Sequence, residues 1–365
     1  MKRRRTPNQL DESLFVAYLL TVVIGLVMVY SSSSIVAASR HGSQLFFIRQ
    51  QLVWASLSVA VLYLLSRIDL KRLVVYSVPA LLVSIVMLGT VFFFPPRNGS
   101  FRWIVLAGFS IQPSELFRFL MVMYLAMALS KPGRDISQWR TLLIPHAPLI
   151  GIGLLLIGAE RDLGSVIVIV GTVVGIFFLA GARIKHLAAF ALPTVSLGSF
   201  VVFVLGYKID RITDYMSAFV DPLKGSYQVR QAILSLGSGG LVGTGLGEGR
   251  QKLGFLPYPH TDFILASAGE EIGLLGLLVL LGLLGFMLFR GFRIAARQPD
   301  RFGYLMAAGM TWMLFVNIAI NIGVVTALLP VTGLPLPFIS YGGSSLLCCS
   351  AAIGILLNLS RRSVR

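Results

Sequence analysis

Residues 14–36 read LFVAYLLTVVIGLVMVYSSSSIV, an apolar run without a single charged side chain. A helix of roughly 20 such residues is long enough to cross the hydrocarbon core of a bilayer. The basic start from Met1 to Arg5 would suit a signal peptide, but the run exceeds the roughly 7 to 15 apolar residues of a cleaved signal. We therefore predict a retained first membrane span.

The same pattern recurs along the whole chain. Of its 365 residues, 56% are hydrophobic and only 13% are charged, whereas a soluble domain has about 25% charged residues. The expected fold class is all-α, a polytopic membrane protein of about ten transmembrane helices in one domain over residues 1–365. The predicted spans are 14–36, 50–66, 73–94, 112–130, 141–159, 164–181, 186–206, 263–289, 303–328 and 340–360.

The distribution of basic residues predicts the orientation. With the N-terminus in the cytoplasm, 19 of the 31 Lys and Arg residues fall in inside segments, five in short outside loops and six in the long loop 207–262. Basic residues concentrate on the cytoplasmic side of membrane proteins. We expect a multi-pass protein of the cytoplasmic (inner) membrane with both termini cytoplasmic and loop 207–262 outside. Because the basic residues are dispersed, the formal charge of +16 does not indicate a nucleic-acid partner.

Loop 207–262 is the longest polar stretch, and an unstructured loop of that length would be unusual unless functional. It is rich in glycine, and residues 227–237 have the pattern of a short amphipathic helix at the interface. The adjacent Cys348 and Cys349 lie in an apolar run and do not indicate a disulfide framework.

Asp262 is the strongest candidate for chemistry. It follows the proline-stiffened stretch 255–261 at the outer end of a predicted span, near His260, Arg250 and Lys252. An aspartate there could simply cap the helix and complement its dipole. A mixed cluster of acidic and basic residues equally suits a functional site, and the residues alone leave both interpretations open.

Other polar residues fall inside predicted spans. Glu115 and Arg118 have i,i+3 spacing, so we expect them to pair and to face the bundle interior, either for structure or along a substrate route. We expect packing roles for Glu270-Glu271 and for the i,i+4 pair Asn317 and Asn321. The Pro- and Gly-rich segment 333–345 predicts a re-entrant or kinked element lining a cavity, or a turn between spans.

Several stretches in order resemble the SEDS family (shape, elongation, division and sporulation), which includes RodA, FtsW and SpoVE. They are Arg102-Trp103, Gln112-Pro-Ser-Glu115, Asp162-Leu-Gly164, Asp221-Pro222, Gly237-Ser-Gly-Gly-Leu241 with Gly243, Gly245 and Gly247, Phe255 to Phe263, Gly269-Glu-Glu-Ile-Gly273 and Gly333 to Ser345. Arg161 departs from the pattern, because relatives usually have proline there. The stretches 249–252 and 30–34 look more like FtsW or SpoVE than RodA.

The resemblance implies a peptidoglycan glycosyltransferase that polymerises lipid II on its undecaprenyl diphosphate carrier. Asp262 matches the family's essential outer aspartate, and Glu115 and Arg118 match its intramembrane pair, with arginine in place of the commoner lysine. The residues expected to bind substrate are Arg250, Lys252, His260, Arg102, Ser340, Gly342, Gly343 and Ser344. No tightly bound cofactor or protein metal site is expected, although a divalent cation (Mg2+ or Mn2+) would help the leaving group.

The resemblance also implies a partner, because the chain has no transpeptidase domain. A class B penicillin-binding protein would cross-link the strands, beside other divisome proteins if the role is septal. Three alternatives stay open: a lipid II flippase or transporter, an elongation-type RodA-like polymerase, and a noncatalytic scaffold.

Overall fold

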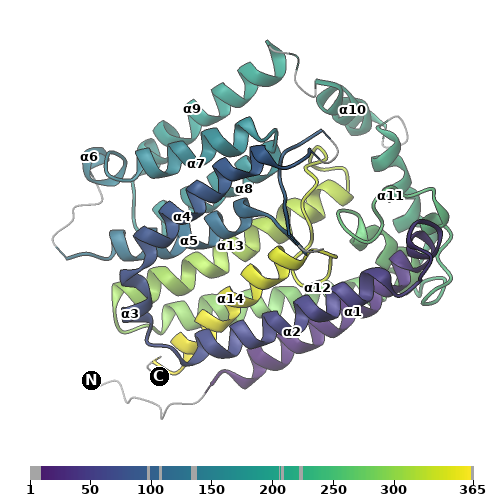
Figure 1. Ribbon diagram of the computed structural model, residues 1–365, viewed down its shortest axis with the longest axis horizontal. Coiled ribbons are helices and arrows are strands. Elements are labelled where there is room, and N and C mark those ends of the chain that lie inside the picture. The colour runs from purple at the N-terminus through teal and green to yellow at the C-terminus, as the bar shows by residue number, and fades with distance from the viewer. Residues whose placement is uncertain are drawn as a thin grey trace.

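The computed structural model describes residues 10–96, 99–106, 109–132, 138–204, 206, 209–221 and 225–362. Nearly all of its regular structure is helical (Figure 1). The helices are α1 (Glu12–His41), α2 (Phe46–Arg67), α3 (Leu70–Val75), α4 (Ser77–Thr90), α5 (Pro113–Leu129), α6 (Trp139–Leu142), α7 (Ala147–Ala159), α8 (Leu163–Leu179), α9 (Ile184–Phe203), α10 (Ile209–Val220), α11 (Tyr227–Ser238), α12 (Ile264–Ala296), α13 (Arg301–Val325) and α14 (Gly343–Ser360).

Each predicted span coincides with one helix or with two in succession, which confirms the all-α membrane fold. Within the part of the chain that the structure describes, five helices are long and apolar enough to cross a membrane, namely α1, α2, α12, α13 and α14, and shorter apolar helices accompany them. Two short antiparallel strands were not predicted, β1 (Ile104–Leu106) and β2 (Phe109–Ile111), in which Ile104 pairs with Ile111.

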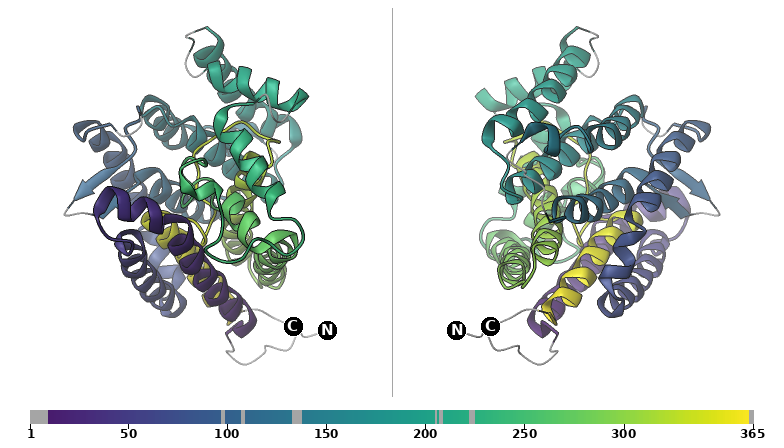
Figure 2. Two further views of the ribbon diagram at one scale, coloured as in Figure 1. Left: turned by 90° about the vertical axis from the view of Figure 1, so that its right-hand side faces the viewer. Right: turned by 90° about the vertical axis from the view of Figure 1, so that its left-hand side faces the viewer.

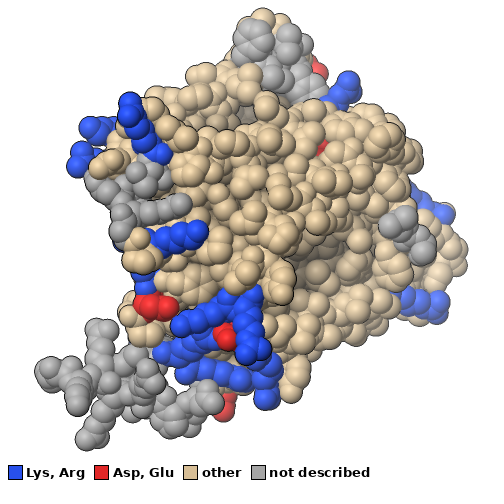
Figure 3. All heavy atoms as spheres, turned by 60° about the vertical axis from the view of Figure 1, so that its left-hand side comes forward, with Lys and Arg blue, Asp and Glu red and all other residues tan. Residues whose placement is uncertain are grey.

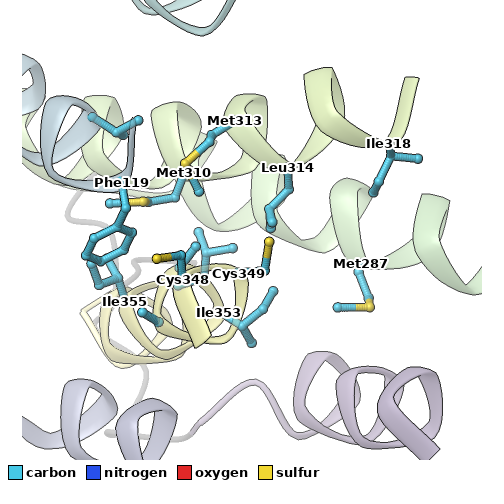
Figure 4. Close-up of a cluster of buried hydrophobic side chains, with 14 of the residues drawn as sticks. Phe119, Met287, Met310, Met313, Leu314, Ile318, Cys348, Cys349, Ile353 and Ile355 are labelled. Atoms are coloured by element: carbon cyan, nitrogen blue, oxygen red, sulfur yellow. The ribbon is translucent and has the colours of Figure 1, made fainter. Parts of the chain in front are cut away.

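The centre of the bundle is formed by α13 and α14. α13 packs against α5, α8, α12 and α14, while α14 packs most extensively against α2. Figure 4 shows Met310, Met313 and Leu314 of α13 facing Cys348 and Cys349 of α14. Both cysteines are buried and free, and with the methionines they are adaptable fillers between the helices.

The two ends of the described chain lie at the same end of the bundle. The Asp11 backbone N–H donates to Ser360 Oγ (3.1 Å), and Asp11 also pairs with Arg290 (2.6 Å). Figure 3 shows Lys and Arg gathered toward this end, with a broad, almost uncharged band beyond them. A chain whose middle contacts lipid has this separation of charge.

At the opposite end, α10 and α11 cover the bundle (Figures 1 and 2). The amphipathic helix expected at 227–237 is present as α11. After α11 the glycine-rich chain packs into a break in α12, where Gly273 has φ 66° and ψ −172°. Leu274 N donates to Gly240 O (2.9 Å), and Thr244 N donates to Glu270 O (2.9 Å). The described part of 207–262 is therefore ordered structure; 207–208 and 222–224 lie outside the described residues.

A tight turn separates α7 from α8, as the short spacing required. Arg161 occupies its left-handed position with φ 64°. A proline ring fixes φ near −65° and cannot adopt this value. The turn in this chain therefore requires a residue other than proline, which accounts for the departure at Arg161.

Candidate active site

Asp262 lies in a cavity of about 460 Å³ at the end of the bundle that bears α10 and α11. The turn before α12 contributes Asp262, the β1–β2 region contributes Arg102, and α10 contributes Arg211. The chain between α13 and α14 supplies residues 331–333, Tyr341 and Gly342, and α14 supplies its first residue, Gly343. Segments far apart in the sequence thus converge on one carboxylate.

The backbone around Asp262 is fixed on two sides. Asn321 Nδ2 of α13 donates to Asp262 O (3.1 Å) and to Leu334 O (2.8 Å). Ser340 Oγ donates to Thr261 O (2.6 Å), and Tyr341 N donates to His260 O (2.8 Å). These bonds tie the aspartate turn to the 334–342 segment, so the direction of the carboxylate is set by the tertiary structure.

The electrostatics of Asp262 favour a base. Burial raises its pKa to about 6, while Arg102 and Arg211 oppose that rise. Gly333, with φ 73°, leaves room where the two charges approach each other. A Cβ there would lie 3.4 Å from Arg102 Nη1 and 3.6 Å from Asp262 Oδ2. Among the described residues, Asp262 forms no ion pair within 4 Å.

Arg102 forms an ion pair with Asp162, a residue for which the sequence analysis predicted no role. Arg102 Nη2 lies 3.3 Å from Asp162 Oδ1. Asp162 caps α8 by accepting from Ser165 N (3.1 Å), and it also accepts from Gln112 Nε2 (3.3 Å). The motifs containing Gln112 and Asp162 were visible in the sequence, but the contacts of Asp162 with Gln112 and Arg102 were not.

A second acidic group, Glu160, lies near the Arg102–Asp162 ion pair. Glu160 is fully buried, and its carboxyl oxygens have no hydrogen-bond partner among the described residues. Burial, together with the nearby charge of Asp162, raises its pKa to about 9. Glu160 is therefore a neutral acid at physiological pH.

The predicted substrate-binding residues separate into two groups. Arg102, Gly342 and Gly343 line the cavity with Asp262. Ser340 and Ser344 do not line it. The Ser340 hydroxyl donates to Thr261 O in the turn that holds Asp262, and Ser344 Oγ accepts from Gln112 N (3.2 Å).

His260 packs against the rings of Phe47 and Tyr341 beside the cavity. Burial lowers its pKa to about 4, so the ring is neutral at physiological pH and supplies no positive charge to a substrate.

Lys252 and Arg250 do not line the Asp262 cavity. Lys252 is buried, and its Nζ contacts Glu271 Oε1 (2.6 Å) and Ser31 Oγ (3.0 Å). Arg250 contributes its backbone N–H to Glu270 (2.6 Å). The positive charge near Asp262 therefore comes from Arg102 and Arg211. The glycine-rich chain 239–249 (the glycine loop) leads into the segment that directs Lys252 into the bundle.

Glu115 and Arg118 form the expected ion pair in the buried interior. Arg118 Nη1 also donates to Asn317 Oδ1 (3.2 Å), so α5 and α13 are joined through a charged group. This pair is separate from the residues that line the Asp262 cavity.

The described residues do not assemble a protein metal site. No group of three or more His, Cys, Asp or Glu side chains in that part of the chain is arranged to hold an ion. Positive charge beside Asp262 comes from the two guanidinium groups.

Comparisons with known proteins agree with the fold. The family model for cell cycle proteins of the FtsW, RodA and SpoVE type matches residues 11–365. Stage V sporulation protein E of Bacillus subtilis is 40% identical and covers 97% of both chains. The probable peptidoglycan glycosyltransferase FtsW of Geobacter metallireducens is 39% identical over 93% of this chain and 91% of its own.

Solved structures extend this similarity to three dimensions. A chain of a peptidoglycan synthase complex that coordinates polymerization and crosslinking superposes with a TM-score of 0.78 at 27% identity, covering 96% of this chain and 98% of its own. The rod shape determining protein RodA of Thermus thermophilus gives 0.71 at 28% identity, over 97% of each chain. The chain described here belongs to the FtsW/RodA/SpoVE family of cell cycle proteins.

Proposed function

We propose that this protein is a peptidoglycan glycosyltransferase that polymerises lipid II at the outer face of the cytoplasmic membrane. The observation that carries the proposal is the Asp262 carboxylate, which lies in a cavity beside two arginines and has a raised pKa. The names of the relatives support the same reaction. A base and an anion-binding cation in one cavity are what glycosyl transfer from a diphosphate requires.

In the proposed mechanism, the 4-hydroxyl of lipid II's N-acetylglucosamine attacks C1 of the growing strand's terminal sugar. The bond between C1 and the diphosphate oxygen breaks, and undecaprenyl diphosphate leaves with the bonding electrons. Asp262 accepts the hydroxyl proton as the new C–O bond forms. Arg102 and Arg211 stabilise the negative charge that develops on the diphosphate.

A divalent cation has no step in this mechanism. The described residues near Asp262 offer cations rather than a set of metal ligands. Oxygen ligands for Mg2+ or Mn2+ would have to come mainly from the substrate's own diphosphate.

The cellular role we propose is division, with both termini in the cytoplasm and a class B penicillin-binding protein as partner. The basic end of the bundle supports the orientation. The similarity to a chain of a peptidoglycan synthase complex supports a cross-linking partner. Septal localisation of a fluorescent fusion is the expected result; distribution along the side wall would favour an elongation role.

Purified protein, with its partner and lipid II, tests the activity. Wild type is expected to form glycan polymer, and Asp262→Asn is expected to form it about 10²- to 10⁴-fold more slowly. Ser217→Ala, an exposed change on α10, serves as the matched control. Absence of polymer from wild type, or a normal amount of polymer from Asp262→Asn, would refute the proposed glycosyltransferase mechanism.

A lipid II transporter is the second candidate, favoured by the buried Glu115–Arg118 pair and by the break in α12 at Gly273. Liposomes that carry fluorescent lipid II separate the two functions. Movement of lipid II between leaflets that persists in Asp262→Asn and is lost in Glu115→Gln would support transport.

A further inference from the structure

A second cavity of about 300 Å³ adjoins the Asp262 cavity. Arg211, Gln228 and Val331 line both, so the two spaces share a wall. The other walls of the second cavity come from α10, the start of α11 and the chain just after α13. Its volume is at the lower end of the range for small-ligand pockets.

The wall between the cavities is held in place. Arg211 Nη1 donates to Val331 O (2.8 Å), and Tyr215 OH donates to Leu328 O (3.0 Å). These bonds join α10 to the chain after α13. The second cavity therefore has a defined shape, as a binding site requires.

Polar groups inside the second cavity remain uncommitted. The side chains of Asp214 and Gln228 are partly buried, and neither makes a hydrogen bond or an ion pair with another described residue. Tyr215 and Tyr227 add aromatic rings to the lining. An amide, a carboxylate and aromatic rings suit a sugar, which presents hydroxyl and acetamido groups together with apolar ring faces.

The position of the second cavity identifies which sugar it would take. Both reacting sugars must meet at Asp262, because the new bond forms there. A polar space that adjoins this site is therefore open to sugars beyond the reacting pair. We propose that the second cavity is a subsite that holds the growing strand of alternating N-acetyl sugars behind its reacting end. This inference rests on the proposed glycosyltransferase function.

Strand length tests the subsite. Wild type, Gln228→Ala and Asp214→Ala are each supplied with lipid II and the partner, and products are separated by size. Mean strand length is expected to fall at least threefold in both variants, while the rate of the first coupling falls by a smaller factor. Ser217→Ala on the exposed part of α10 is the control. Unchanged strand length, or an equal fall in length and first coupling, would overturn the subsite.

A binding measurement separates the subsite from the proposed activity. The probe is a lipid-free tetrasaccharide of alternating N-acetylglucosamine and N-acetylmuramic acid, added to Asp262→Asn protein. Its Kd is expected to rise at least fivefold when Gln228→Ala is added, at an unchanged melting temperature. No binding, or binding indifferent to Gln228→Ala, would overturn the subsite. Specific binding alongside inactive wild-type protein would refute only the glycosyltransferase.

Discussion

Asp262 in the turn before α12 and Glu271 within α12 are carboxylates nine positions apart, and their surroundings are opposite. Glu271 is buried and accepts from Lys252 Nζ (2.6 Å), Ser31 Oγ (2.7 Å) and Gly247 N (3.2 Å). Asp262 faces a cavity, where its pKa is raised to about 6. The difference indicates that Glu271 holds the structure together, whereas Asp262 retains the capacity to react with a substrate.

The physical reason is how far the desolvation cost of each carboxylate is offset by its partners. Removing a carboxylate from water is costly, and a close cation with several hydrogen bonds offsets that cost. Glu271 has these partners, and they fasten the glycine loop to α12 and to α1. Asp262 has the more distant arginines and the Thr261 hydroxyl, which offset less of the cost, so part of it appears as increased basicity.

Asp262→Asn gives the largest expected effect. Loss of the base should lower the polymerisation rate by about 10²- to 10⁴-fold. The melting temperature in detergent should stay within about 2 °C of wild type, because no ion pair is broken. Steady-state rates and thermal unfolding measure the two quantities. A large fall in stability would place Asp262 with Glu271 as a structural residue.

Glu271→Gln should instead reduce stability, because it leaves the buried Lys252 ammonium without its counter-charge. Breaking such a pair costs about 3–5 kcal/mol. Thermal unfolding in detergent measures the loss. Combining Glu271→Gln with Lys252→Met should recover most of it, since no unpaired charge is then buried. A double variant as unstable as the single one would show that the pair is not the cause.

Arg102→Gln should change how the activity depends on pH. Protonated Asp262 cannot act as a base, so kcat/KM should rise with pH through a pKa of about 6. Arg102 lowers that pKa, so its removal should move the rise to higher pH. Arg102→Lys should restore part of the shift. A pH profile that is unchanged in Arg102→Gln would exclude the proposed electrostatic contact.

Glu160→Gln is expected to have the smallest effect. The folded-state pKa of Glu160 is raised to about 9, so the folded protein keeps a proton that the unfolded chain loses above about pH 4.5. This residue therefore destabilises the fold increasingly as pH rises from about 4.5 to 9. Glu160→Gln should raise the melting temperature by a few degrees at pH 8 and hardly at all at pH 5. An equal gain at both pH values would contradict a neutral Glu160.

Much of the fold was accessible from local sequence because apolar runs of sufficient length form helices in lipid whatever their neighbours. The run 14–36 corresponds to α1, and the run 340–360 corresponds to α14. The β1–β2 pair was missed, since it is only three residues per strand and has no periodic pattern. The break at Gly273 was also missed, because it depends on the inserted glycine loop.

The candidate site was accessible only in part. Asp262 and Arg102 were identified and do line one cavity. Lys252 was close to Asp262 in sequence but is directed away from it, while Arg211, some fifty residues earlier, is brought to the cavity. The Glu115–Arg118 pair was predictable because helical spacing alone places both side chains on one face.

The linear sequence was enough to predict the helical membrane fold, the concentration of basic residues toward one end and the position of Asp262 in a polar segment next to a span. These properties follow from hydrophobicity and charge, which act residue by residue along the chain. Which charges are neutralised and which remain available to a ligand became clear only from the folded protein. That outcome depends on distances between residues such as Lys252 and Glu271, or Arg102 and Asp162, which packing sets and spacing along the chain does not.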